Sequence, residues 1–150
     1  MSKNTVAYTA ALLSFILNLS CHADTLFSLT KSELEQVVVN NTLKSVAIDN
    51  LNGQTINNTF SMYMDDQGKI YGKMSLKPID QPQYDQGTYS ISDDGTFYIT
   101  WQHWDEQQTL CGHLFTTANA YISVDCDDIF HTVFMTDDIQ PGNHIQGGLS

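Results

Sequence analysis

Arginine is absent from this sequence of 150 residues, and six lysines stand against 17 aspartates and glutamates, which gives a formal net charge of −11. Binding to a nucleic-acid backbone needs clustered cations that displace counterions, and this chain has no such cluster. Without arginine, the chain also lacks the bidentate donor that commonly clamps phosphate groups. We therefore expect no nucleic-acid partner and little attraction to anionic lipid.

Motifs of several enzyme classes are missing as well. The sequence contains no glycine-rich phosphate loop, no nucleophile elbow and no metalloprotease helix. Asp105 and Glu106 are adjacent carboxylates, but they lie in a predicted loop and do not identify a glycosidase. We therefore expect a protein that is not an enzyme and that needs no cofactor.

The first 23 residues have the three parts of a secretory signal peptide. Lys3 lies in a short polar start, an apolar run follows over 6–17, and Cys21 and Ala23 supply small residues before a cleavage site at Asp24. The apolar run is too short for a permanent membrane span. We expect a protein exported to the periplasm or secreted, with a single mature domain over 24–150.

Cysteine is scarce, with three copies, and one of them lies in this leader. Residues 18–21 weakly resemble a lipoprotein cleavage box, which would make Cys21 a lipid anchor; ordinary cleavage after Ala23 is the favoured alternative. Ordinary cleavage leaves two cysteines in the mature chain. In an exported protein these two predict one disulfide, Cys111–Cys126.

A short helix is predicted near the start of the mature chain, over about 31–39. Thr30 and Glu33 match the capping box that begins many helices, and Leu34, Val37 and Val38 lie on one apolar face. The helix is expected to plug or flank a sheet.

From about residue 42, apolar residues alternate with period two and turn residues separate the runs. The pattern predicts a mainly β domain, an antiparallel meander that forms a small barrel or a strongly bent sheet. We expect a loose tail from about residue 141. The aspartate pairs fall where turns are needed, and none has the spacing of a calcium loop.

Short loops fix how the predicted strands pair. Read as three- and four-residue loops, they place Met64 opposite Ile70, Tyr89 opposite Ile99, Trp101 opposite Cys111, and Cys111 opposite Cys126. The third of these pairs assumes a three-residue loop at 105–107. In this register the four strands that contain Tyr89, Ile99, Cys111 and Cys126 have their apolar residues on one common face. Trp101 would then cover the disulfide.

The chain resembles a group of small exported bacterial domains of unknown function, which are similar in shape to calycin-like barrels. The resemblance rests on Gly87-Thr88-Tyr89, Asp93-Asp94-Gly95, Trp101, Cys111 and Cys126. It covers roughly residues 30–143. It implies a β-barrel fold and an exported location, and it implies no activity.

Two groups of side chains are candidate binding residues. Aromatic rings are expected on the second face of the strands, where they suit contact with a protein or a carbohydrate: Tyr63, Tyr71, Tyr98, Trp104 and Tyr121. Packing of these rings across the strands is the alternative. Histidines form the second group, a candidate metal site of His103, His113 and His131.

Three functions therefore remain open at this point. The first is an exported, non-enzymatic β domain that binds an unknown protein or small ligand through the barrel mouth or the aromatic face. The second is a metal-binding protein that uses the three histidines. The third is a lipid-anchored structural protein of the cell envelope.

Overall fold

The computed structural model describes residues 26–46, 59–75 and 81–145. In these ranges the chain is mainly β. The strands are β1 (Phe27–Ser28), β2 (Asn41–Lys44), β3 (Thr59–Met64), β4 (Lys69–Ser75), β5 (Gln83–Ile91), β6 (Phe97–Trp101), β7 (Thr109–Thr116), β8 (Ala120–Asp125), β9 (Phe130–Met135) and β10 (Gln140–Pro141). One α-helix, α1 (Lys31–Val38), and two short 3₁₀ helices, Trp104–Gln107 and Thr136–Asp138, complete the described elements. The expected leader and its cleavage site lie outside the described residues.

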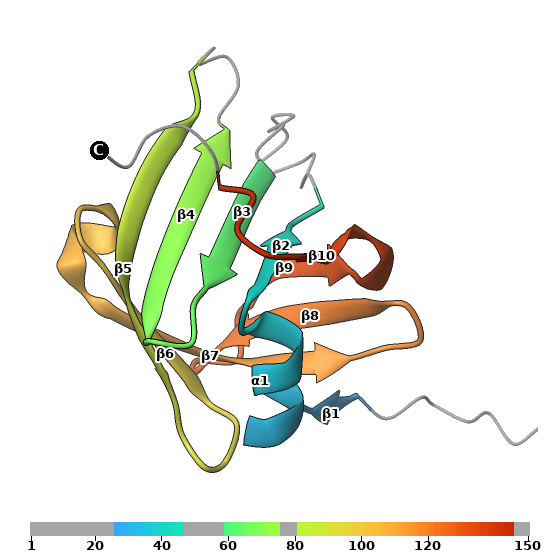
Figure 1. Ribbon diagram of the computed structural model, residues 1–150. Helices are drawn as coiled ribbons and strands as arrows, with labels where there is room; N and C mark the ends of the chain where they lie inside the picture. Colours follow the sequence, from blue (N-terminus) through green and yellow to red (C-terminus); the bar gives the residue numbers. More distant parts are fainter. Residues whose placement is uncertain (1–25, 47–58, 76–80, 146–150) are drawn as a thin grey trace, which may run out of the picture.

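The strands from β2 to β9 pair in chain order, each antiparallel to the next. The sheet curls strongly, so that β2 and β9 come close together (Figure 1). An antiparallel bridge between Ser45 and Phe134 and a hydrogen bond from the Val46 N–H to the Val133 carbonyl join the two ends of the sheet. The predicted meander and its curled shape are confirmed.

The helix α1 begins where the capping box predicts. The Thr30 hydroxyl accepts a hydrogen bond from the Glu33 N–H, and the Glu33 carboxylate accepts one from the Thr30 N–H. These bonds satisfy two backbone donors that a helix start would otherwise leave unpaired. Leu34 and Val38 are fully buried in the core cluster. The helix therefore covers part of the interior of the curled sheet.

Hairpins with short loops have the predicted register. Met64 pairs with Ile70 across β3 and β4, and Tyr89 pairs with Ile99 across β5 and β6. Gly68 has a φ of 80° in the first of these loops, in the left-handed region that glycine adopts without steric strain. Aspartates act in the turns as expected: one Asp65 oxygen accepts from the Gln67 and Lys69 N–H groups.

The register between β6 and β7 differs from the prediction. Tyr98 pairs with Cys111, and Trp101 pairs instead with Gly87 of β5. The connection is longer than the assumed loop at 105–107, because residues 102–108 include a 3₁₀ helix with three consecutive residues at positive φ. The expectation that Trp101 lies opposite Cys111 and covers the disulfide is therefore wrong.

This change of register reverses the two faces of β7 and β8, because a shift by an odd number of residues exchanges the sides of a strand. Ile99 pairs with Leu110, so Leu110 and Leu114, four residues further on, lie on the inner face of β7. Ser123 pairs with Leu114 and therefore lies on the inner face of β8. Phe115 and Ile122, which pair with each other, lie on the outer face. The four strands β5 to β8 therefore do not share one apolar face in the predicted way.

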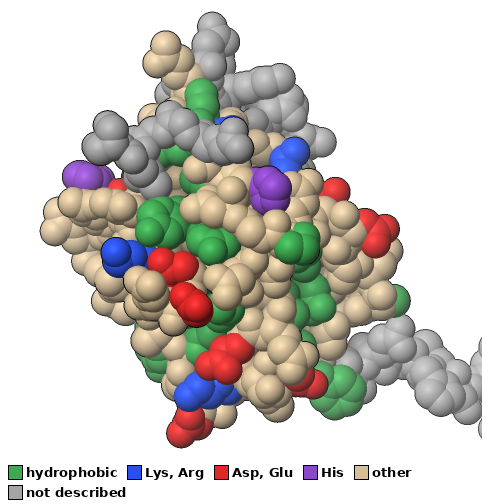
Figure 2. Space-filling model, viewed as in Figure 1, with side chains coloured by type: hydrophobic (Ala, Val, Ile, Leu, Met, Phe, Trp, Pro, Cys, Tyr) green, Lys and Arg blue, Asp and Glu red, His purple; other side chains and the backbone are tan. Residues whose placement is uncertain are grey.

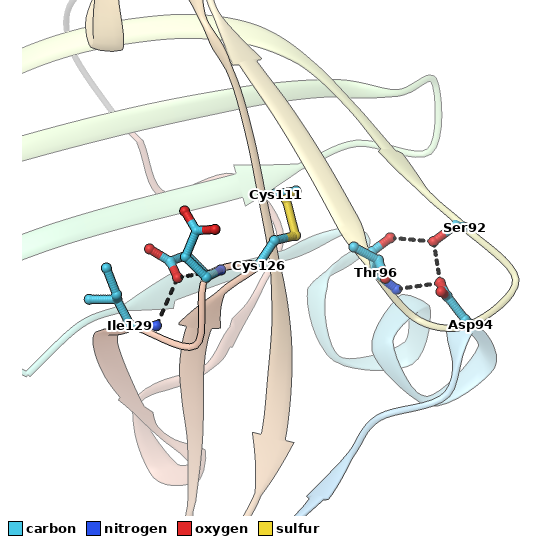
Figure 3. Close-up of a disulfide and its surroundings, with 8 residues drawn as sticks. Ser92, Asp94, Thr96, Cys111, Cys126 and Ile129 are labelled. Carbon is cyan, nitrogen blue, oxygen red and sulfur yellow. Dashed lines mark hydrogen bonds between the residues drawn. A yellow bond between two sulfur atoms is a disulfide. The ribbon is translucent and has the colours of Figure 1, made fainter.

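The pairing of β7 with β8 follows the prediction, and it brings Cys111 and Cys126 together. Cys111 and Cys126 form a disulfide with their Cα atoms 5.6 Å apart. Figure 3 shows the bridge beside the turn that follows β8. The disulfide prediction is confirmed.

The chain near its C-terminus is more ordered than expected. β10 pairs with β2, and the Gly142 N–H donates to the Asn40 carbonyl. The His144 N–H donates to the Thr42 hydroxyl, and Ile145 is buried. The expected loose tail from about 141 is thus hydrogen-bonded to residues 40–42 as far as His144. In the described ranges, no helix has the length and apolar character needed to cross a membrane.

Candidate ligand cavity inside the curled sheet

The interior of the curled sheet contains a cavity of about 280 Å³. Most of its wall is apolar and comes from four different elements: Leu34 and Val38 of α1, Met64 of β3, Ile99 and Trp101 of β6, and Phe134 of β9. All of these side chains belong to the core cluster. The cavity is therefore a gap in the hydrophobic core, larger than the roughly 150 Å³ engineered cavity that binds benzene.

One end of the cavity is polar. Thr109, Ser123, Asp125, Asp127, His131 and Thr132 line it, together with the two bridged cysteines. Asp127 and His131 are exposed, so the cavity wall reaches the protein surface at this end. The arrangement combines an apolar interior with a polar rim, as small-molecule sites commonly do.

Two buried hydroxyls in this wall have no hydrogen-bond partner among the residues that the structure describes. Ser123 of β8 is 7% exposed and Thr132 of β9 is 6% exposed, and the two residues pair directly across the strands. Neither side chain makes a hydrogen bond to any residue that the structure describes. Because a buried hydroxyl without a partner is energetically unfavourable, these two groups indicate a missing hydrogen-bonding partner in the cavity.

The other buried polar side chains do have partners. Thr42 donates to the Gly142 carbonyl, Ser45 accepts from the Phe60 N–H, and Asp85 accepts several N–H groups. Thr96 is hydrogen-bonded to Asp94. Of the buried polar side chains that line the cavity, Ser123 and Thr132 thus have no partner among the described residues.

Carboxylates at the rim make this end of the cavity electronegative. One Asp125 oxygen accepts the Asp127 and Ile129 N–H groups, 2.9 and 2.8 Å away, and so shapes the turn in Figure 3. None of the residues that line the described cavity is a lysine. Figure 2 shows further acidic side chains spread over the visible face of the protein. The potential at the rim therefore favours a cation over an anion.

A second polar group, Asp85 with His103, lies just beyond the C-terminal end of β6. Asp85 is 2% exposed, and it accepts hydrogen bonds from the His103 N–H, the Trp104 N–H and the His103 Nδ1, at 2.8, 2.8 and 2.9 Å. Burial alone would raise the pKa of Asp85, but the hydrogen bonds from His103, Trp104 and Gln86 outweigh it, so the pKa is lowered.

The Asp85 group holds the β6–β7 connection in place. Trp104, whose N–H binds Asp85, packs against Trp101 with ring centroids 4.9 Å apart. Both rings lie over Gly72, where an added Cβ would come within 2.5 Å of Trp104. His103 is largely exposed, and no third ligating side chain joins it among the described residues. The geometry is that of a structural anchor.

The five predicted aromatic residues do not form one surface. Tyr63 and Tyr71 pair on the outer face of β3 and β4, with ring centroids 6.0 Å apart, and Tyr98 is 39% exposed on the outer face of β6. Trp104 and Tyr121 instead pack against the core. The expectation that these last two point outward is wrong, because the β6–β7 connection folds Trp104 inward and Tyr121 pairs with the buried Phe134.

The three predicted metal ligands also lie apart. His113 is on the outer face of β7 beside Phe115, His103 is bound to Asp85, and His131 lies at the cavity rim. In the part of the chain that the structure describes, no three His, Cys, Asp or Glu side chains are grouped as a metal ion requires. The shift of register removes the shared face on which the histidine prediction depended.

Sequence reasoning missed the residues that give the cavity its polar end. Ser123 and Asp125 occupy alternate positions in β8, and with the observed register they face inward. The predicted register placed the apolar residues of this strand on the common inner face, so the polar residues Ser123 and Asp125 were expected to face outward.

Comparison of the chain with protein-family models, with curated proteins and with solved structures finds no match.

Proposed function

We propose that this protein binds a small, mainly apolar molecule in the cavity between the curled sheet and α1. The observation that carries the proposal is the gap of about 280 Å³ in an otherwise packed core, apolar inside and polar where it reaches the surface. Protein interiors are normally filled to crystal-like density, so a gap of this size weakens the core unless a ligand fills it.

The proposal is tested with n-butylbenzene, a neutral probe with an apolar body. Binding is expected to raise the midpoint of thermal unfolding, because a ligand that binds only the folded state stabilises it. Amide signals of Leu114, Ser123 and Phe134 are expected to shift in a two-dimensional NMR titration, since these residues line the cavity.

A matched pair of variants locates the binding. Leu110→Trp places a large ring on the inner face of β7 at the cavity wall, and it is expected to abolish the effect of n-butylbenzene. Ile122→Trp places the same ring on the outer face of β8, where it leaves the cavity open. The proposal is wrong if the probe changes neither the melting temperature nor the cavity amides of the unmodified protein.

We also propose that the domain works outside the cytoplasm. The disulfide supports this location, because such bonds persist in oxidising compartments and are rare in the cytosol. The signal-peptide pattern of the first 23 residues supports it independently. The intact mass of the protein produced with its leader, before and after reduction, tests both processing and oxidation.

A further inference from the structure

The polar wall of the cavity constrains the chemistry of its ligand, and the inference below rests on the proposed function. A purely apolar ligand would fill the gap between α1 and the sheet. It would leave the hydroxyls of Ser123 and Thr132 without partners, at a site that is more than nine-tenths buried. Buried polar groups in folded proteins are nearly always hydrogen-bonded, to protein or to ordered water, and a polar group on the ligand would supply the partner that these two hydroxyls lack among the described residues.

The positions of the two hydroxyls limit the size of that polar group. Ser123 and Thr132 lie directly opposite each other on β8 and β9. Opposed residues of an antiparallel pair have their Cβ atoms about 5 Å apart, so one small group between them can bond to both. The polar group is therefore compact and lies close to the cavity wall.

The charges at the rim determine the sign of the charge on the polar group of the ligand. Asp125 and Asp127 line the same end of the cavity, and no lysine does among the described lining residues. Asp127 is exposed, and its carboxylate makes no hydrogen bond to a described residue. A carboxylate ligand would be repelled here, whereas an ammonium group can donate to the two hydroxyls and attract the two carboxylates.

We propose that the ligand is an amphiphilic amine, with an apolar body among the core side chains and an ammonium group near Ser123, Thr132 and Asp127. The hydroxyls accept hydrogen bonds from the ammonium N–H groups, and the carboxylates compensate its charge. The apolar body fills the space lined by Trp101 and Phe134. The site thus selects against fatty acids and other anions that have an apolar body.

Three ligands with one body and different head groups test this assignment: 4-phenylbutylamine, 4-phenylbutan-1-ol and 4-phenylbutyrate. Calorimetric titration is expected to show the amine binding at least about tenfold more tightly than the alcohol, because charge-assisted hydrogen bonds are roughly twice as strong as neutral ones. The carboxylate is expected to bind more weakly than the alcohol.

Two substitutions test the hydroxyls without disturbing the fold. Ser123→Ala and Thr132→Val are each expected to weaken binding of the amine about fivefold relative to binding of n-butylbenzene by the same variant. Neither is expected to lower the melting temperature of the ligand-free protein, since each removes a buried hydroxyl that has no described partner. Ser90→Ala, on the outer face of β5, is the control.

A third substitution tests the rim charge. Asp127→Asn is expected to reduce the preference for the amine over the alcohol, while Asp66→Asn, in the exposed β3–β4 turn, leaves it unchanged. Leu110→Trp is expected to abolish binding of the amine, which separates the cavity from attraction to the acidic surface as a whole.

The outcomes distinguish the two proposals. If n-butylbenzene binds but the amine has no advantage over the alcohol, the head-group assignment is overturned and the apolar cavity stands. If the carboxylate binds most tightly, the assignment is likewise overturned. If none of the four molecules binds, the proposed function itself fails.

Discussion

Asp94 forms a small hydrogen-bonded unit in the loop between β5 and β6. Its carboxylate accepts from the Ser92 hydroxyl and from the Thr96 N–H, as Figure 3 shows. The Ser92 hydrogen bond, followed by that from Thr96, lowers the pKa of Asp94 to about 2 from its ordinary value of 3.8. Folding therefore favours the ionised form of this carboxyl group.

A pH dependence follows from that lowered pKa. The ionised Asp94 stabilises the folded state above pH 3.8, and this contribution is lost as the pH falls from there through about 2. Ser92→Ala, which removes the main cause of the shift, is expected to make the decline of unfolding free energy between pH 4 and 2 less steep. Urea denaturation at a series of pH values measures this slope. Ser90→Ala is the control, and an identical slope in Ser92→Ala would refute the assignment.

At the scale of elements, hairpins were predictable where a short loop fixed the register. Met64 with Ile70 and Tyr89 with Ile99 pair as the loop lengths require. Helix α1 was predictable as well, because its capping box is local in sequence. These features depend on neighbours within a few residues.

The β6–β7 connection was not predictable, because a distant residue determines it. Asp85 lies on β5 and binds the N–H groups of His103 and Trp104, 18 and 19 positions further along. No loop motif in 102–108 signals this contact. The wrong register between β6 and β7 also affected the prediction of the cavity. Its apolar wall could be expected from the alternation of apolar and polar residues in the strands, but its polar end depends on the register that Asp85 helps to set.

The role of Asp85 as an anchor is testable. Asp85→Ala leaves the His103, Trp104 and Gln86 N–H groups without their acceptor in a buried site, and it is expected to lower the free energy of unfolding by about 2–4 kcal/mol. Chemical denaturation measures the change. Asp66→Ala, an exposed turn residue, is expected to stay within about 0.5 kcal/mol. Equal free energies of unfolding for the two variants would show that Asp85 does not stabilise the β6–β7 connection.

For the whole molecule, the register of β7 and β8 decides whether the interior is full or hollow. The predicted register would place the bulky Phe115 and Ile122 inside the curled sheet. The observed one places Leu114 and the small Ser123 there and turns the bulky pair outward. Because Ser123 lines the gap and Phe115 and Ile122 do not, the cavity is a consequence of this exchange of faces.

The mass of the mature protein is expected to show where the leader is cleaved, whether a lipid is attached and whether the disulfide has formed. Cleavage after Ala23 leaves a chain that starts at Asp24 with two cysteines, whereas processing as a lipoprotein leaves a lipid on Cys21. Since Cys111 and Cys126 are bridged, alkylation under denaturing, non-reducing conditions is expected to add nothing, and alkylation after reduction is expected to add two groups.

Mass spectrometry of the protein produced with its leader in a bacterial host, before and after reduction, reads both features in one experiment. Ser substitution of both Cys111 and Cys126 is the control for alkylation at other sites. A full-length mass would contradict export, a lipid adduct would show that the domain is tethered, and two adducts without reduction would contradict the disulfide. A mature chain from Asp24 with a closed bridge would place the cavity and its polar rim outside the cytoplasm, where only exogenous or envelope molecules reach it.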